Sequence, residues 1–229
     1  MQLTPRLEAI ARKVTYKATV ADIGTDHAYI PIYLVENNVT NIVYACDINQ
    51  GPINMANKQI EKYGYTREIT TMLGPGLDPI VGMDVENIII AGMGGILIKG
   101  IIEANKETAL NAHRLILQPM IAQEELRQYL IQNGFQIIEE DLAQEDRRIY
   151  QIILAKKGKS EPWAEIDYHI SPILVQDKHP LLHELITAKE NELNKIIKAC
   201  SVEKSENAKV RREECSYLLE KIKVVKKCL

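Results

Sequence analysis

Apolar and polar positions along the chain follow two periods. Short apolar runs of strand length alternate with stretches whose apolar residues recur every three or four positions, as on one face of a helix. The predicted strands are 18–23, 42–46, 69–73, 85–91, 114–118, 135–139 and 149–155. The predicted helices are 5–16, 29–37, 52–63, 95–104 and 122–132, the first beginning at Thr4-Pro5. This alternation predicts a doubly wound α/β domain over residues 1–157.

Two runs, NIIIAG and RLILQP, are apolar on both faces, which favours a parallel sheet with helices on both sides. The last two runs, FQIIEED and RRIYQIILAKK, have no helix between them and predict an antiparallel hairpin at the sheet edge. A seventh strand folded back in this way is typical of the Rossmann-like sheet of class I methyltransferases and atypical of nicotinamide-binding sheets.

Residues 158–229 follow a different pattern. KKGKSEPW reads as a linker, and YHISPILVQDKHP carries two prolines that interrupt regular structure. From Leu181 onward, two amphipathic stretches flank the polar segment SVEKSENA. They predict an antiparallel, coiled-coil-like α-helical hairpin as a C-terminal domain.

Charge is unevenly divided between these parts. The 229 residues carry a formal net charge of −3. From Thr187 onward there are 11 Lys and Arg against 7 Asp and Glu, whereas the remainder has 17 against 24. A basic tail on an acidic body is typical of an arm that binds nucleic acid. The alternative, a solvated helical face, stays open on charge alone.

The cysteines and the hydropathy of the chain indicate the cellular compartment in which the protein acts. The four cysteines show no CxxC pairing, which predicts reduced thiols without a metal or disulfide framework. No apolar run approaches the ~20 residues of a membrane helix, and the first residues lack a signal-peptide pattern. We expect a cytoplasmic protein that uses neither a membrane nor a metal, and the sequence leaves its oligomeric state open.

The segment VADIGTDHAYIPIYL, residues 20–34, places a glycine turn after the first strand. A dinucleotide site would need a second glycine at position 26, where this chain has Asp26. A carboxylate beside a pyrophosphate is repulsive by about 1 kcal/mol or more. S-adenosylmethionine has no phosphate and carries a positive sulfonium, so an acidic turn accommodates it.

Three further segments lie where parallel strands end. Asp47 follows the second strand, about 25 residues after the turn, where a carboxylate accepts hydrogen bonds from ribose hydroxyls. A helix N-cap is the alternative for Asp47. Gly74 and Gly76 in LGPGLDPI are predicted to line the pocket for the adenine of the cofactor. IAGMGG, residues 90–95, occupies the position that holds the target base in methyltransferases.

These residues resemble a known family. ADIGTDHAYIPIYL, CDINQGP, IIIAGMGGILI, RLILQPM and the IYQIILAKKG ending are similar to the bacterial tRNA (adenine(22)-N(1))-methyltransferase family. The resemblance covers essentially the whole chain, helical tail included. It implies S-adenosylmethionine as cofactor, tRNA as partner, and methylation of adenine N1. The chain departs from the family at Met120, where Asn is common, and at Pro75, where a polar residue is usual.

Residue roles follow from these motifs. Asp26 is the predicted catalytic residue: it would accept a hydrogen bond from the adenine N6 amino group and stabilise the charge that develops on the ring. A helix N-cap is the alternative for Asp26. The predicted cofactor contacts are Asp22, Gly24, Asp47, Ile48, Gly76, Leu77, Gly92 and Met93. The predicted substrate contacts are His27, Tyr29, Arg6 and Pro119, with Tyr29 as a stacking surface and Arg6 on the methionine carboxylate or an RNA phosphate. Packing at the start of the helix is the alternative for His27 and Tyr29.

Methyl transfer to N1 needs placement of two reactants rather than a covalent enzyme intermediate, and the base must leave its stack in folded tRNA. Two other function classes stay open on the sequence. One is a methyltransferase that acts on a protein or a small molecule, with the tail serving dimerisation. The other is a non-catalytic RNA-binding protein that keeps a degenerate Rossmann core.

Overall fold

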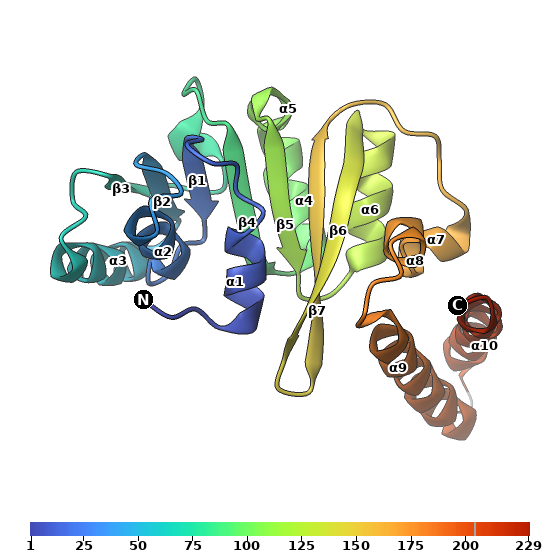
Figure 1. Cartoon of the computed structure of the whole chain (residues 1–229). Coiled ribbons are helices and arrows are strands. Elements are labelled where there is room, and N and C mark those ends of the chain that lie inside the picture. Colours follow the sequence, from blue (N-terminus) through green and yellow to red (C-terminus); the bar gives the residue numbers. More distant parts are fainter. Residues whose placement is uncertain (204) are drawn as a thin grey trace. The chain divides into compact units, whose positions relative to one another are not determined.

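The computed structural model describes residues 1–203 and 205–229. The chain divides into two compact units, Met1–Pro162 and Trp163–Leu229. The first unit holds the sheet and the second holds the helical hairpin (Figure 1).

A seven-stranded sheet forms the centre of the first unit, in the order β3-β2-β1-β4-β5-β7-β6. Its first five strands are parallel, and β7 runs antiparallel to both of its neighbours. The strands are β1 (Val20–Ile23), β2 (Val43–Asp47), β3 (Ile69–Leu73), β4 (Asn87–Met93), β5 (Arg114–Pro119), β6 (Phe135–Glu145) and β7 (Arg148–Lys157). The predicted methyltransferase-type sheet is confirmed, including the strand that folds back.

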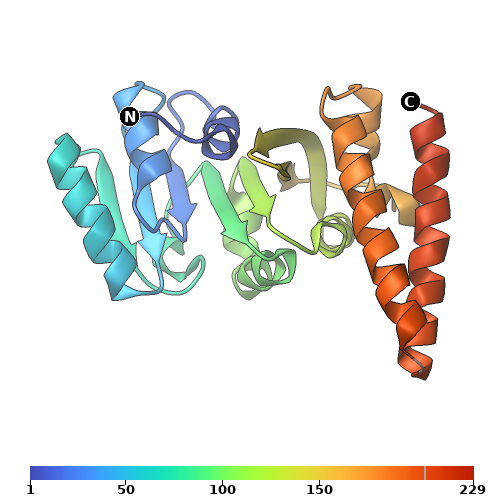
Figure 2. The same cartoon turned by 90° about the horizontal axis from the view of Figure 1, so that it is seen from below.

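Helices cover both faces of this sheet (Figure 2). Ile10, Ile32 and Ile60, from α1, α2 and α3, share one buried cluster with Val20 and Ile89 of the strands. α4 and α6 lie on the other face. The helices of this unit are α1 (Pro5–Ala11), α2 (Tyr29–Glu36), α3 (Gln50–Tyr63), α4 (Gly95–Ala104), α5 (Lys106–Asn111) and α6 (Gln123–Gln132), with a 3₁₀ turn η1 (Asp78–Ile80).

The first helix is shorter than the predicted 5–16. It ends at Ala11, and the amide of Val14 then turns back to the carbonyl of Ala11. The Thr15 amide donates to Asn87 Oδ1 at 2.9 Å, a side-chain acceptor that replaces the helical carbonyl. The helical pattern of apolar residues extends beyond Ala11, but the hydrogen bond from Thr15 to Asn87 of the sheet favours the end of the helix before that residue. The prediction also omitted the short helix α5.

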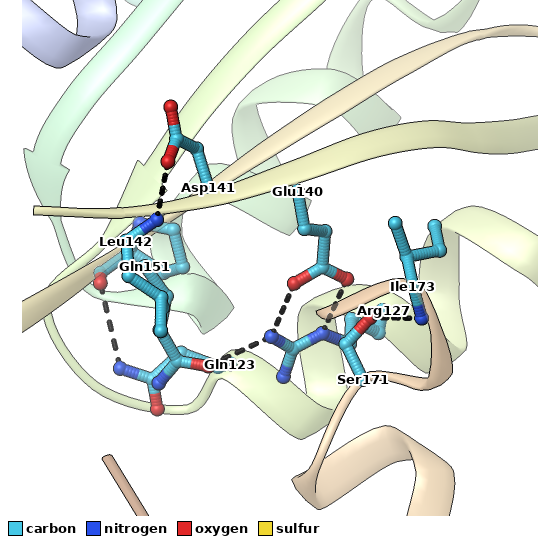
Figure 3. A network of polar contacts seen from close by, with 9 residues as sticks. Gln123, Arg127, Glu140, Asp141, Leu142, Gln151, Ser171 and Ile173 are labelled. Carbon is cyan, nitrogen blue, oxygen red and sulfur yellow. Dashed lines mark hydrogen bonds and ion pairs between the residues drawn. The ribbon is translucent and has the colours of Figure 1, made fainter. Parts of the chain in front are cut away.

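A buried ion pair fastens α6 to the hairpin of β6 and β7 (Figure 3). Arg127 is fully buried and donates from Nε and Nη2 to the two carboxylate oxygens of Glu140, at 2.9 and 2.6 Å. Nη2 also donates to Gln151 Oε1 at 2.7 Å. The two parallel bonds to Glu140 fix the angle between helix and sheet, because a guanidinium and a carboxylate match in only one plane.

The second unit consists of helices. Two short ones, α7 (Glu165–His169) and α8 (Pro172–Gln176), precede the long pair α9 (Leu182–Val202) and α10 (Glu206–Lys227). The long pair confirms the predicted hairpin, while α7 and α8 were not predicted. The Ser171 hydroxyl caps α8 by accepting a hydrogen bond from the Ile173 amide, and Pro172 lies in the first turn of the same helix. Pro172 therefore begins a helix instead of interrupting regular structure.

An ion pair closes the open end of the hairpin, where Lys226 Nζ lies 2.6 Å from Glu190 Oε2 and 3.2 Å from Thr187 Oγ1.

No helix among the described residues combines the length and the hydropathy that crossing a bilayer requires.

Candidate functional site

The site forms where β1, β2 and β4 end side by side. The strand order places β1 between the other two, and its turn is fixed by the Gly24 and Thr25 amides, which donate to the Cys46 carbonyl at 2.8 and 3.0 Å. Gly24 has φ +78°, and a Cβ on it would collide with Met93 Cε. The positive φ of this turn therefore favours glycine, and a larger residue would also displace the flexible Met93 side chain.

Two carboxylates flank the end of this turn. Asp22 is buried, and burial raises its pKa to about 6, with the charge of Asp47 adding to the shift. Burial also raises the pKa of the Cys46 thiol to about 12, so this cysteine stays protonated and unreactive. A buried carboxylate with a raised pKa is poised to gain from a cation placed beside it.

Asp47 does not cap the helix that follows it. The N-cap of α3 is Asn49, whose backbone amide donates to Asp47 Oδ1 at 2.8 Å. Next to Asp47, Ile48 is 63% exposed, and Leu73 at the end of β3 is also exposed. An acidic group beside bare apolar surface suits a ribose and an adenine. Leu77, a predicted cofactor contact, is fully buried, backbone included, so it supports the wall of the site from behind and presents no surface to a ligand.

The turn that carries Asp26 leads into α2. Asp26 and Ala28 both have positive φ, +46° and +56°, and Ala28 is the N-cap, without a side-chain cap bond. Asp26 is therefore not the N-cap of α2, and its side chain is 69% exposed. A non-glycine residue held in the left-handed region is often found at a functional turn.

Two aromatic rings stand beside this carboxylate. His27 and Tyr29 stack with centroids 5.2 Å apart and planes 17° apart. His27 Nε2 lies 3.6 Å from Asp26 Oδ2. Tyr29 is exposed, so its free face is open to a flat partner.

On the β4 and β5 side, Gln118 joins segments that are distant in the sequence. Its Oε1 accepts from Arg6 Nη1 at 2.9 Å and from the Gly92 amide at 3.2 Å. Its Nε2 donates to the Pro119 carbonyl at 3.0 Å and approaches Met120 Sδ at 3.6 Å. All four hydrogen-bonding positions of the amide are thus used, which fixes its orientation.

Arg6 is held from three directions. Besides Gln118, its guanidinium lies 5.3 Å from the Tyr150 ring centroid, and Nε is 4.0 Å from Glu145 Oε2. The long β6–β7 hairpin thereby reaches the side of the site formed by the ends of β4 and β5. Sequence reasoning missed Gln118, Glu145 and Tyr150; only the LQP segment offered a signal, and it was interpreted through Pro119 and Met120.

The structure brings the predicted residues to one edge of the sheet. Asp22, Gly24, Asp47, Ile48 and Gly76 lie in or directly after β1, β2 and β3. Gly92 and Met93 end β4, and Pro119 is buried at the end of β5. Among the residues that the structure describes, no three His, Cys, Asp or Glu side chains gather to hold a metal ion.

This arrangement fits S-adenosylmethionine better than a dinucleotide. The turn presents the Asp26 carboxylate where a pyrophosphate would need bare backbone, and the buried Asp22 favours a positive ligand. The surface beside Asp47 is apolar. The residues therefore accommodate an uncharged adenosine joined to a cationic group.

Comparison with known proteins gives a consistent result. The family described as tRNA (adenine(22)-N(1))-methyltransferase matches residues 20–227. The Bacillus subtilis tRNA (adenine(22)-N(1))-methyltransferase is 38% identical over 158 residues, which cover 69% of this chain and 66% of that protein, or just under two thirds of its length.

Solved structures extend the likeness to the whole chain. A Streptococcus pneumoniae protein in complex with S-adenosyl-L-methionine superposes with a TM-score of 0.87 at 30% identity, covering 98% of this chain and 100% of that one. The M. capricolum TrmK in complex with S-adenosyl-homocysteine gives 0.83 at 31% identity, with 98% of both chains covered.

Proposed function

Because the chain belongs to the tRNA (adenine(22)-N(1))-methyltransferase family, we propose that it methylates N1 of adenine 22 in tRNA with S-adenosylmethionine as methyl donor. The single observation in the structure that carries this proposal is the acidic glycine turn after β1. It combines the exposed Asp26 with the buried Asp22 at the carboxyl edge of a methyltransferase-type sheet.

When bound, S-adenosylmethionine supplies a sulfonium methyl: the N1 lone pair forms the new N–C bond while the S–C bond breaks, leaving a neutral thioether and a positive charge on the adenine ring. N1 carries no proton in the free base, so no base is needed to activate it. The protein's task is to hold two reactants in line and to stabilise the charge that appears on the ring.

The side chains divide this task between two sides of the site. Asp22 and Asp47 hold the cationic and ribose parts of the cofactor, while Gly24, Gly76, Gly92 and Met93 shape the walls and Ile48 lies against the adenine. Asp26 accepts a hydrogen bond from the N6 amino group of the target adenine. This bond orients N1, and the carboxylate balances the positive charge that develops on the ring. Tyr29, backed by His27, stacks on the target base.

Arg6 lies at the boundary between cofactor and target. With its contacts to Gln118 and Tyr150, the Arg6 side chain is 22% exposed. From this position it meets an anionic group, either the methionine carboxylate of the cofactor or an RNA phosphate. Because Gln118 also holds the Gly92 amide, the place of Arg6 is set relative to the loop that ends β4.

We further propose that the hairpin of α9 and α10 binds the tRNA backbone and that the protein acts in the cytoplasm. An acidic catalytic unit by itself repels a polyanion, so basic side chains elsewhere must offset that repulsion. Lys195, Lys198 and Lys223 are exposed on the two long helices. Lys226 belongs to the hairpin's own ion pair and is not counted among them.

The decisive experiment is mass mapping of nucleosides after unmodified tRNA is incubated with the protein and S-adenosylmethionine. We expect one new 1-methyladenosine, located at position 22. Methylation of a different nucleotide would refute the positional assignment. Label that enters protein or small molecules instead of tRNA would support the rival transferase, and failure to bind S-adenosylmethionine in calorimetry would support a non-catalytic RNA-binding protein.

A further inference from the structure

Four large apolar side chains stand in solvent beside the end of β4. Ile96 and Leu97 in the first turn of α4 are 65% and 56% exposed, and Met120 and Ile121 after β5 are 37% and 69% exposed. We call these four residues the apolar rim. No charged residue occurs from Gly92 to Ile98 or from Leu115 to Gln123, so both segments are uncharged as well as apolar.

Backbone contacts hold the two halves of the rim together. The Gly95 amide donates to the Ile121 carbonyl at 2.8 Å, and the Met120 amide donates to the Met93 carbonyl at 2.8 Å. A Cβ on Gly95 would collide with the Ala122 carbonyl oxygen, so only glycine permits this approach. The rim is therefore fixed to the loop that ends β4.

The loop after β5 carries local strain that points to a selected conformation. Ala122 has φ +58°, a region unfavourable to a residue with a Cβ. Ile121 lies directly before it and against Gly94, with Cγ1 3.6 Å from where a Gly94 Cβ would be. An exposed isoleucine is thus maintained over the β4 loop by a strained neighbour, although burying it would lower the free energy in water.

We propose that the apolar rim, with Ile121 at its tip, is a wedge that enters the base stack of tRNA and fills the gap left by the extruded adenine. The proposal rests on the proposed function, since a base that is methylated on N1 must leave its pair and stack. Apolar side chains inserted between bases stabilise such an opening. Phosphates would be met by Lys or Arg, and the rim has neither, so its partner is the flat face of a base.

The test follows extrusion separately from methyl transfer. A tRNA with 2-aminopurine at the nucleotide next to adenine 22 keeps the N6 amino group of the target base and reports unstacking by a rise in fluorescence when protein is added. We expect the rise with the wild type and with Ile121→Leu, which keeps the bulk, and its loss with Ile121→Ala. Val81→Ala is the matched control, because Val81 is 55% exposed but lies before β4, away from the rim.

Methylation rates supply the second arm. Ile121→Ala should lower kcat/KM on folded tRNA by about tenfold or more, but by less than about twofold on a tRNA with an abasic site opposite adenine 22, since that base needs little help to leave the stack. S-adenosylmethionine affinity should not change.

Three results would overturn the wedge. The first is a rise in 2-aminopurine fluorescence with Ile121→Ala that equals the rise with the wild type. The second is an equal loss of rate on both substrates, and the third is a change of oligomeric state in sedimentation that accounts for the lost activity. In all three the wild type still methylates tRNA. A wild type that leaves tRNA unmethylated would instead refute the proposed function.

Discussion

Asp22 shows how one residue can link pH to ligand binding. Its carboxyl group is buried at the end of β1, and burial raises its pKa to about 6. In the free protein the protonated form is favoured below that value. In the proposed cofactor site a cationic ligand favours the ionised form, so the proton and the cofactor would compete for Asp22.

The first prediction concerns this competition. Between about pH 6 and pH 4 the affinity for S-adenosylmethionine should fall by about tenfold for each unit of pH, because Asp22 must lose a proton before it can interact with the cation. The free energy of unfolding of the unliganded protein changes in the opposite direction. Because the pKa of Asp22 in the folded protein lies above the ordinary 3.8, protonation of Asp22 stabilises the unliganded fold as the pH falls over the same range.

Calorimetry from pH 7.5 to pH 4.5 measures the effect. Asp22→Asn should bind weakly at every pH, with a much flatter profile. A wild-type affinity that stays constant down to pH 5 would exclude Asp22 from the cation site.

The second prediction concerns Asp26. Asparagine tolerates the left-handed backbone of this turn as aspartate does, so Asp26→Asn preserves the conformation and removes only the charge. We expect kcat to fall by about a hundredfold, because the positive charge on the adenine ring loses its counter-charge. S-adenosylmethionine affinity should change by less than about twofold, because the proposed contacts of Asp26 are with the target base.

Single-turnover methylation and calorimetry on the same variant separate these effects. Should Asp26→Asn methylate tRNA at the wild-type rate, the carboxylate would have no part in the chemistry.

At the scale of elements, the hairpin of β6 and β7 both closes the sheet and reaches the site. In the middle part of its strands, Glu140 and Gln151 bind Arg127 of α6. Toward its tip, Glu145 and Tyr150 hold Arg6 of α1. The same two strands therefore connect a buried structural ion pair with the Arg6 side of the candidate site.

The third prediction tests the buried pair. Arg127→Met should lower the free energy of unfolding by about 3–5 kcal/mol, because it leaves the Glu140 carboxylate buried without its cation. The double variant Arg127→Met with Glu140→Leu should recover most of that loss, because no charge then remains in the core. Urea denaturation of both variants checks this.

Arg211→Met is the control, since it breaks the exposed pair with Glu214 and should cost no more than about 1 kcal/mol. If the double variant is less stable than Arg127→Met alone, the contribution of the pair is more than charge compensation.

At the largest scale, charge is divided along the chain: the stretch from Thr187 onward carries a net +4 and the remainder a net −7. The basic excess lies in the long helices, where part of it is used internally: Lys226 pairs with Glu190, Lys209 with Glu206, and Arg211 with Glu214. The cations that remain for a polyanion are therefore fewer than the composition suggests.

The fourth prediction concerns those cations. The triple variant of Lys195, Lys198 and Lys223 to Gln should weaken tRNA binding and reduce the slope of log K against log salt by about one for each phosphate that a lysine no longer neutralises. S-adenosylmethionine binding should be unaffected. The matched control is the triple variant of Lys58, Lys62 and Arg67 to Gln, exposed in or just after α3 of the catalytic unit.

Filter binding across a salt series measures both triple variants. Equal effects of the two would mean that tRNA responds to net charge alone, and unchanged binding in the hairpin variant would mean that its lysines are merely solvated.

Local patterns of residues are enough to predict the type of sheet, the helical hairpin and the acidic glycine turn. Each depends on a local pattern: apolar runs for buried parallel strands, a helical repeat for α9 and α10, and the replacement of a glycine by Asp26. Family resemblance, carried by the same short motifs, then indicated the cofactor and the substrate.

Contacts between residues that are distant in the chain could be known only from the folded protein. Arg6, Gln118 and Tyr150 are separated by more than a hundred positions at the extremes, and their contact depends on β7 inserting between β5 and β6. The end of α1 depends in the same way on Asn87, and the exposure of Ile121 depends on Gly95. Local patterns record which face of an element is buried, but a hydrogen bond between remote side chains leaves no period in the sequence.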